Sequence, residues 1–177
     1  MSDARTRVEV LAEIGHINLR GDPGRGAFRE IAERVLGQPL PITPNTVSEG
    51  GHRVCWLGPD EWSVVTAAGD AGVLLEQLQT ALAGEHAAVN DLSGGLAVVR
   101  ISGADSRRLF ARGCTLDFHP DKFVPGSCAQ AGLAKASVLF IHTGGRDVFD
   151  LVVRRSFLDY MVRWLRHAGA ELDIEFH

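Results

Sequence analysis

The chain has 177 residues, which is enough for one large domain or for two small ones that share a core. Hydrophobic residues make up 45% and charged residues 23%, an ordinary globular composition, and the formal net charge of −4 gives no electrostatic reason to expect nucleic acid or an anionic membrane as a partner. No apolar run approaches the roughly 20 residues of a membrane-spanning helix, no apolar signal-peptide segment follows the first residues, and the three cysteines form no disulfide framework, so we expect a cytoplasmic protein.

The first half of the chain predicts two helices among several strands. The clearest signal is an apolar stripe with the period of a helix, formed by Phe28, Ile31, Ala32, Val35 and Leu36. Asp22 and Pro23 suit the start of this helix, and Gly37 suits its end. The expected elements are, in chain order, a strand within 9–19, a helix over 23–36, a loop over 38–51, strands over 53–57 and 61–66, a helix over 70–84 and a strand over 87–92.

The second half of the chain predicts the same order of elements. They are a strand over 96–101, a helix over 104–112, a long loop reaching 130, strands over 133–142 and 149–153 around the turn Gly144-Gly145-Arg146, a helix over 156–168 and a strand over 172–176. Ser156 and Asp159 have the spacing of a capping box at the start of the last helix. The buried face of that helix is expected to consist of Phe157, Met161, Trp164, Leu165 and Ala168.

Each half therefore follows the order β-α-β-β-α-β, which is the split βαβ or ferredoxin-like pattern. We predict an α+β protein with antiparallel sheets, in which residues 1–95 form the first half and residues 96–177 the second. Each half is small for an independent core, so we expect one compact unit in which the two sheets meet across a shared interface.

Residues 96–130 gather the side chains most often used in chemistry, namely Cys114, His119 and Cys128. Their spacing, C-x4-H-x8-C, matches no common zinc pattern, because such patterns favour close pairs. A nucleophilic thiol would need a nearby base, but Cys114 follows a helix C-terminus, whose partial negative charge disfavours the thiolate, and no base is marked beside Cys128. The sequence therefore favours structural roles for all three.

Two further patterns carry less information about a site. Gly21, Gly24 and Gly26 follow a strand and precede a helix, but their spacing fits no phosphate-binding motif. The arginines at 107, 108, 112, 154 and 155 suit an anionic ligand, an acidic partner or a solvated face, and together with the three tryptophans they favour an interface. We predict no catalytic, cofactor-binding or metal-ligating residue in this chain.

Four segments between residues 57 and 165 carry a family signature. They read Leu57-Gly58-Pro59-Asp60-Glu61-Trp62; Asn90-Asp91-Leu92-Ser93 with Ile101-Ser102-Gly103; Gly113-Cys114-x-Leu116-Asp117-x-His119-Pro120 with Phe123-x-Pro125-Gly126-x-Cys128-Ala129-Gln130; and Val153-Arg154-Arg155-Ser156-Phe157-x-Asp159-Tyr160. Together they resemble the gamma subunit family of heterotetrameric sarcosine oxidase, and the third segment is the most specific.

The resemblance implies a structural subunit that is not itself catalytic and that assembles with alpha, beta and delta subunits. In such complexes the alpha and beta subunits carry FAD, covalent FMN and NAD, and the delta subunit binds zinc. The complex oxidatively demethylates sarcosine to glycine and passes the one-carbon unit to tetrahydrofolate. Dimethylglycine, N-methylglutamate or another N-methylated amine is an equally compatible substrate, because the substrate would lie in another chain.

The resemblance also implies a fold similar to the folate-binding domains of glycine-cleavage T-protein and YgfZ-type proteins. Of the YgfZ-type loop motif, Cys128 and Gln130 are present, but its Lys, Tyr, second Gly and Glu are absent, so no folate or redox role is predicted for this loop. The alternative function is a stand-alone folate-binding or folate-dependent one-carbon module, which rests on the analogy of fold alone.

Overall fold

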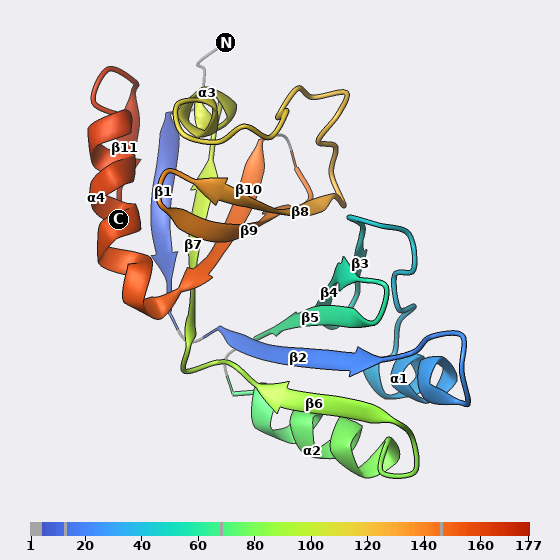
Figure 1. The fold of residues 1–177 in the computed structure, drawn as a ribbon. Coiled ribbons are helices and arrows are strands. Elements are labelled where there is room, and N and C mark those ends of the chain that lie inside the picture. Colours follow the sequence, from blue (N-terminus) through green and yellow to red (C-terminus); the bar gives the residue numbers. More distant parts are fainter. Residues whose placement is uncertain (1–4, 13, 68, 146) are drawn as a thin grey trace. The chain divides into compact units, whose positions relative to one another are not determined.

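The computed structural model describes residues 5–12, 14–67, 69–145 and 147–177. Glu13, within a predicted strand, and Arg146, within a predicted turn, lie outside the described residues. The chain divides into two compact units, which Figure 1 colours by sequence. The first unit comprises residues 14–94, and the second comprises residues 5–12 and 95–177. Within the described ranges, no helix is both long and apolar enough to cross a membrane.

The first unit is a five-stranded sheet packed against two helices. Its strands, in spatial order, are β3 (Val47–Glu49), β4 (Arg53–Gly58), β5 (Glu61–Thr66), β2 (Gly15–Gly21) and β6 (Ala87–Asp91). The helices are α1 (Phe28–Leu36) and α2 (Ala71–Ala81). Alternation along β5 directs Trp62 and Val64 to the core, where they join Phe28 of α1 and Leu78 of α2. Each such buried side chain contributes roughly 1.5–3 kcal/mol to folding.

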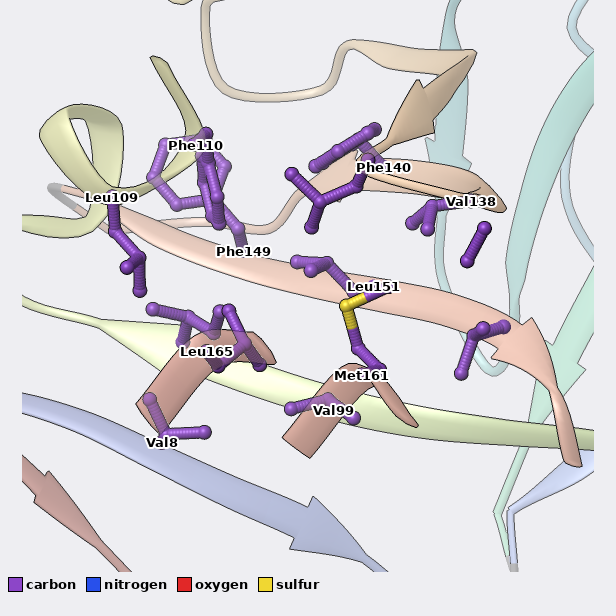
Figure 2. Close-up of a cluster of buried hydrophobic side chains, with 14 of the residues drawn as sticks. Val8, Val99, Leu109, Phe110, Val138, Phe140, Phe149, Leu151, Met161 and Leu165 are labelled. Carbon is purple, nitrogen blue, oxygen red and sulfur yellow. The ribbon is translucent and has the colours of Figure 1, made fainter. Parts of the chain in front are cut away.

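The second unit is a six-stranded sheet with helices α3 (Ser106–Ala111) and α4 (Leu158–Ala168). Its strands, in spatial order, are β11 (Ile174–Phe176), β1 (Thr6–Leu11), β7 (Leu96–Ser102), β10 (Val148–Arg154), β9 (Ala136–His142) and β8 (Cys128–Leu133). Figure 2 shows Met161 and Leu165 of α4 beside Val99 and Leu151 of the sheet. These residues are fully buried, because the apolar stripe of α4 faces the apolar side of the strands.

The two sheets have the same strand order once the N-terminal strand is set aside. The order β3-β4-β5-β2-β6 of the first unit corresponds to β8-β9-β10-β7-β11 of the second, with β1 inserted between β7 and β11. β1 runs antiparallel to β7 and parallel to β11. The predicted α+β class and the predicted repeat of ferredoxin-like halves are confirmed.

The predicted division into residues 1–95 and 96–177 needs a correction at the N-terminus. The segment 9–19, which was expected to hold one strand, contributes to two strands in different sheets, and β1 belongs to the second unit. The physical reason is pairing: Val8 lies opposite Ile101, and β1 occupies the edge of β7 that would otherwise expose its backbone groups. The expected interface between the two sheets concerns the placement of the units and stays a prediction.

Turns precede α1 and α4 where the sequence predicted their first residues. The side chain of Asp22 accepts a hydrogen bond from the Gly24 amide at 2.9 Å and so forms a turn, and α1 starts only at Phe28. The predicted capping box is wrong, because residues 155–157 form a short 3₁₀ turn, η1 (Arg155–Phe157), and α4 begins at Leu158 without a side-chain cap. As a result Phe157 is 39% exposed, whereas the sequence pattern placed it on the buried face.

Two strands lie where loops were predicted. β3 is a short strand that pairs with β4 within the expected loop 38–51. β8 occupies the end of the expected long loop and forms a hairpin with β9, in which Leu133 pairs with Ala136. Ala134 adopts a positive φ of 53° in this turn, a conformation that glycine or asparagine usually supplies. The turn therefore carries no sequence signal, and the predicted strand 133–142 is in fact the end of one strand and all of the next.

Candidate functional site

The residues singled out for chemistry lie in or beside the loop 113–127, which joins α3 to β8 and is called the anchored loop below. It begins at Gly113, where the ring of Trp164 approaches so closely that an added Cβ would lie 2.4 Å from Trp164 Cζ2. Gly113, which directly follows the helix predicted over 104–112, is therefore required for packing. This contact fixes the first end of the loop against α4.

Two aromatic side chains of the anchored loop point into the core of the second unit. Phe118 and Phe123 are each 5% exposed. The ring centroid of Phe118 lies 4.9 Å from that of Phe110 and 5.0 Å from that of Phe140, and Phe123 lies 5.4 Å from Phe118. Figure 2 shows Phe110, Phe140 and Phe149, the part of this cluster that the helix and the sheet supply. The tilted and edge-to-face geometries are those that aromatic pairs prefer.

A single arginine of α3 holds the backbone of the anchored loop. Arg107 Nη1 donates to the carbonyl oxygens of Phe118 and Phe123, and Nε donates to Asp147 Oδ1 at 2.6 Å. The guanidinium carbon lies 5.0 Å from the centroid of the Phe149 ring, which gives a cation–π contact. The Arg107 side chain is only 16% exposed, so its donors are used within the chain rather than offered to a ligand.

His142, the last residue of β9, provides the second polar anchor. Its Nδ1 lies 2.9 Å from the carbonyl oxygen of Phe123, which requires a proton on Nδ1, and its ring stacks on Phe149 at 4.5 Å. Burial lowers the pKa of His142 below its ordinary value of 6.5; the hydrogen bond to Phe123 opposes this shift, and the positive charge of Arg107 adds to it. The ring is therefore neutral at physiological pH, with a buried Nε2 that has no hydrogen-bond partner among the described residues.

The three predicted candidates do not form a site. Cys114 is half-buried, and its Sγ lies 3.5 Å from the Leu116 amide nitrogen. The His119 side chain is 62% exposed, and Cys128 is fully buried as the first residue of β8. Across the part of the chain that the structure describes, no three His, Cys, Asp or Glu side chains are grouped so as to hold a metal ion. The geometry thus gives the anchored loop a packing role.

Most of the predicted arginines are likewise tied within the chain. Arg108 pairs with Asp105 at 2.6 Å on the surface of α3. Arg112 donates to the carbonyl oxygen of Ala168 at the end of α4, and Arg155 Nη2 donates to that of Leu96 at 3.0 Å. The Arg154 side chain is exposed at the end of β10 and makes no hydrogen bond or ion pair with another described residue.

The ion pair between Arg100 and Asp150 was not predicted from the sequence. Arg100 of β7 donates through Nε and Nη2 to both carboxylate oxygens of Asp150 in β10, at 2.7 and 2.9 Å. This bond raises the pKa of Arg100, and the Asp150 side chain is only 1% exposed. The two residues lie directly opposite each other in the ladder. A single charge in each of the two otherwise apolar segments 96–101 and 149–153 was the signal that could have revealed them.

The glycine-rich turn of the first unit borders a surface hollow of about 700 Å³. Asp22, Arg25, Gly26, Glu85 and His86 contribute to its lining. Two carboxylates beside one arginine disfavour a phosphate, in agreement with the absence of a phosphate-binding spacing. Gly21 serves packing, since a Cβ there would lie 2.4 Å from the Phe28 ring, and Gly26 adopts a positive φ of 62°.

The chain is similar to known proteins both in sequence and in fold. Residues 20–171 match the model of the sarcosine oxidase gamma subunit family. The gamma subunit of sarcosine oxidase from Corynebacterium sp. (strain P-1) is 32% identical over 170 residues, which cover 96% of this chain and 82% of that protein. A chain of the heterotetrameric sarcosine oxidase from Corynebacterium sp. U-96, solved with pyrrole 2-carboxylate, superposes with a TM-score of 0.89 and 28% identity over 97% of this chain and 87% of that chain.

The fold also matches an enzyme of a different system. Aminomethyltransferase T of the glycine cleavage system from Bartonella henselae superposes with a TM-score of 0.73 over 99% of this chain and 48% of that chain. The sequence identity is 14%, so this likeness concerns the fold alone. It confirms the predicted similarity to the T-protein fold.

Proposed function

The chain belongs to the sarcosine oxidase gamma subunit family, and from this membership we propose that it is the structural gamma subunit of a heterotetrameric sarcosine oxidase-type flavoenzyme. The observation that carries the proposal is the superposition on a chain of such a heterotetramer, with a TM-score of 0.89 over nearly the whole length. Alpha, beta and delta subunits would be its partners.

The chemistry of the complex would belong to those partners. Among the side chains that suggested chemistry or ligand binding, Cys128 is buried, Cys114 and Arg107 make internal hydrogen bonds, and His119 is exposed rather than packed with the two cysteines. We therefore assign the oxidative demethylation of sarcosine, and the FAD, FMN, NAD and tetrahydrofolate that it uses, to the other subunits. This chain would stabilise their assembly.

A cytoplasmic location is part of the same proposal. Its support is the cysteine pattern of the sequence: three cysteines, at 55, 114 and 128, are an odd number without the spacing of a disulfide framework, as is typical of proteins of a reducing compartment.

Reconstitution tests the proposed function directly. The chain is co-expressed with candidate alpha, beta and delta subunits, and the mixture is separated by size exclusion. The expected result is a single peak that contains all four chains and oxidises sarcosine. A chain that elutes alone while the other three assemble into an equally active and stable enzyme would contradict the proposal. Isothermal titration of the isolated chain with tetrahydrofolate is the companion measurement, and no binding is expected.

A further inference from the structure

The second unit holds its N-terminal strand, β1, in a gap between two strands that have anchors of their own. In the first unit the corresponding strands, β2 and β6, pair directly, whereas β1 separates β7 from β11 (Figure 1). On one side of the gap, β7 pairs with β10 along its whole length. On the other side, β11 is attached to α4 and its end: a Cβ added at Gly169 would lie 2.7 Å from Ile174 Cδ1, and the Arg166 guanidinium carbon lies 4.3 Å from the Phe176 ring centroid. Both walls of the gap are therefore held by contacts that do not involve β1.

β1 itself contributes little apolar surface to the core. Among its six residues, all of which the structure describes, Val8 is the one apolar side chain that is buried, and Val10 is 38% exposed. The neighbouring strand β10, by contrast, buries Phe149, Leu151 and Val153 in the same core. Because apolar burial supplies most of the free energy that holds an element in place, an opening that releases β1 costs less than the unfolding of the whole unit.

Both walls of the gap make specific contacts with one residue of β1, Thr6. The Thr6 hydroxyl oxygen accepts a hydrogen bond from the Asp105 amide at 2.9 Å, and the Thr6 amide donates to the Asp173 carbonyl oxygen at 3.1 Å. Gly103, with a φ of 124°, makes room for the Thr6 backbone, because an added Cβ would lie only 2.6 Å from Thr6 Cα. The gap is therefore fitted to a small residue with a hydroxyl group at this position.

The charged face of β1 fixes its register. Arg7 lies opposite Glu175 of β11, and Glu9 lies opposite Arg100 of β7. A slip of two residues would place Arg7 opposite Arg100, and like charges directly opposite each other are destabilising. A slip of one residue would turn Val8 out of the core. The gap thus selects a segment in which a hydroxyl residue, a cation, a β-branched apolar residue and an anion follow one another.

We propose that β7 and β11 form a strand-binding groove, that β1 fills this groove reversibly, and that the groove accepts β1 of a second copy of the chain in the same way. The second copy is the occupant because it carries the segment that the groove already fits. Addition of a strand to a sheet is an established mode of recognition, in which the main chain gives affinity and the side chains give specificity. The strand from the second copy makes the contacts that the chain's own strand gives up, so concentration governs the exchange. The chain's own strand competes at an effective concentration on the order of millimolar.

A peptide with the sequence of residues 5–12 serves as the strand of a second copy. It carries a fluorophore, and its affinity for the whole chain is measured by fluorescence anisotropy for the wild type, Val8→Ala and Val10→Ala. Val8→Ala weakens the chain's own strand and leaves the groove unchanged, so we expect this variant to bind the peptide about tenfold more tightly than the wild type does. Val10→Ala, at an exposed position of the same strand, should bind within about twofold of the wild type. The same affinity for the wild type and Val8→Ala would overturn the inference.

A disulfide distinguishes the groove from any other surface that could bind the peptide. Arg7 and Ser102 lie directly opposite each other in β1 and β7, and the Cα atoms of such pairs are close enough for a disulfide. We expect the oxidised double variant Arg7→Cys/Ser102→Cys to bind no peptide, and reduction to restore binding to at least the wild-type level. Binding by the oxidised variant would overturn the inference. This measurement decides the question even if circular dichroism shows that Val8→Ala does not fold.

Discussion

The two units of the molecule fix the loop after their first helix by different chemistry. In the first unit, the buried Gln38 donates through Nε2 to the carbonyl oxygens of Ser48 and His52, at 3.0 and 3.1 Å, and its Oε1 accepts from the His52 amide at 3.2 Å. In the second unit, Arg107 and His142 hold the anchored loop through its backbone carbonyls. Glu33 also contributes to the first loop, since its Oε1 accepts from the Leu40 amide at 3.0 Å. The two loops therefore differ in the side chains that hold their carbonyl groups: a neutral amide in the first unit, and a guanidinium and an imidazole in the second.

The difference teaches which interactions each loop depends on. A neutral amide makes hydrogen bonds worth about 1 kcal/mol each and does not respond to pH. A guanidinium paired with a carboxylate and stacked on a ring makes stronger bonds, and a neutral histidine beside it makes the loop sensitive to protonation. The second unit adds five clustered phenylalanines, so its loop is also part of the core.

The buried phenylalanines of the anchored loop are expected to contribute most to the free energy of unfolding. Phe118→Ala removes a buried ring that contacts four other rings, and we expect the free energy of unfolding of the second unit to fall by about 3–5 kcal/mol. Urea denaturation combined with hydrogen exchange measures the loss and locates it. Val124→Ala, at a loop position that is 44% exposed, should change stability by less than about 0.5 kcal/mol. Equal effects of the two variants would show that the ring is not an anchor.

The Arg107 guanidinium should make the second-largest contribution to the free energy of unfolding. Arg107→Met keeps much of the side-chain volume but leaves Asp147 and two loop carbonyls without their donor, so we expect a loss of about 2–3 kcal/mol and faster exchange of amides in the loop. Arg108→Met, which breaks an exposed pair with Asp105, is the matched control and should cost less than about 1 kcal/mol. If both arginines behave alike, the contrast drawn between the two loops is wrong.

The Gln38 side-chain amide of the first unit should make the third-largest contribution to the free energy of unfolding. Gln38→Ala leaves the part-buried His52 amide and two carbonyls short of a partner, and a loss of about 1–2 kcal/mol is expected, confined to the first unit. Gln79→Ala, in which an exposed amide loses one bond to the Val89 carbonyl, is the control, with an expected loss below about 0.5 kcal/mol. A loss that appears instead in hydrogen exchange of the second unit would mean that the units do not respond separately.

Much of the fold follows from local signals in the sequence. The strand predicted over 61–66 is observed as β5, and Gly37 ends α1 in the left-handed conformation that glycine adopts readily. Local sequence signals failed to predict the strands whose position depends on pairing with residues far away in the sequence. β1 is fixed by its partner β7, and the β8–β9 hairpin turns at Ala134 without a turn residue, so neither is readable from a short window.

The site was less predictable than the fold. The sequence drew attention to Cys114, His119 and Cys128 by residue type, whereas the structure uses Arg107, His142 and the two loop phenylalanines. Residue type indicates which interactions a side chain can make. Its actual partners here depend on the course of the loop, and a loop has no sequence periodicity from which that course could be predicted. Phe157 shows the same limit: helical periodicity placed it inside, and one 3₁₀ turn moved it to the surface.

His142 is expected to contribute least to the free energy of unfolding. The direction in which its contribution changes with pH follows from its lowered pKa. Because the pKa of His142 in the folded chain is lower than its ordinary value of 6.5, the unfolded chain binds this proton more readily. Its contribution to stability is therefore complete above pH 6.5, falls as the pH is lowered through the range between the two pKa values, and levels off below the folded value. Protonation would also place a charge beside Arg107, which disfavours the folded state further, while Asp147 opposes this effect.

His142→Gln isolates this contribution, because glutamine retains an amide donor for the Phe123 carbonyl and does not titrate. The free energy of unfolding is measured for both proteins from neutral pH downwards, so that the carboxylates common to both cancel in the difference. We expect the wild type to lose more stability than the variant below pH 6.5, and the exchange protection of the anchored loop to decrease with it. Parallel curves would mean that His142 titrates alike in the folded and unfolded chains, and that the two loops differ in strength but not in pH response.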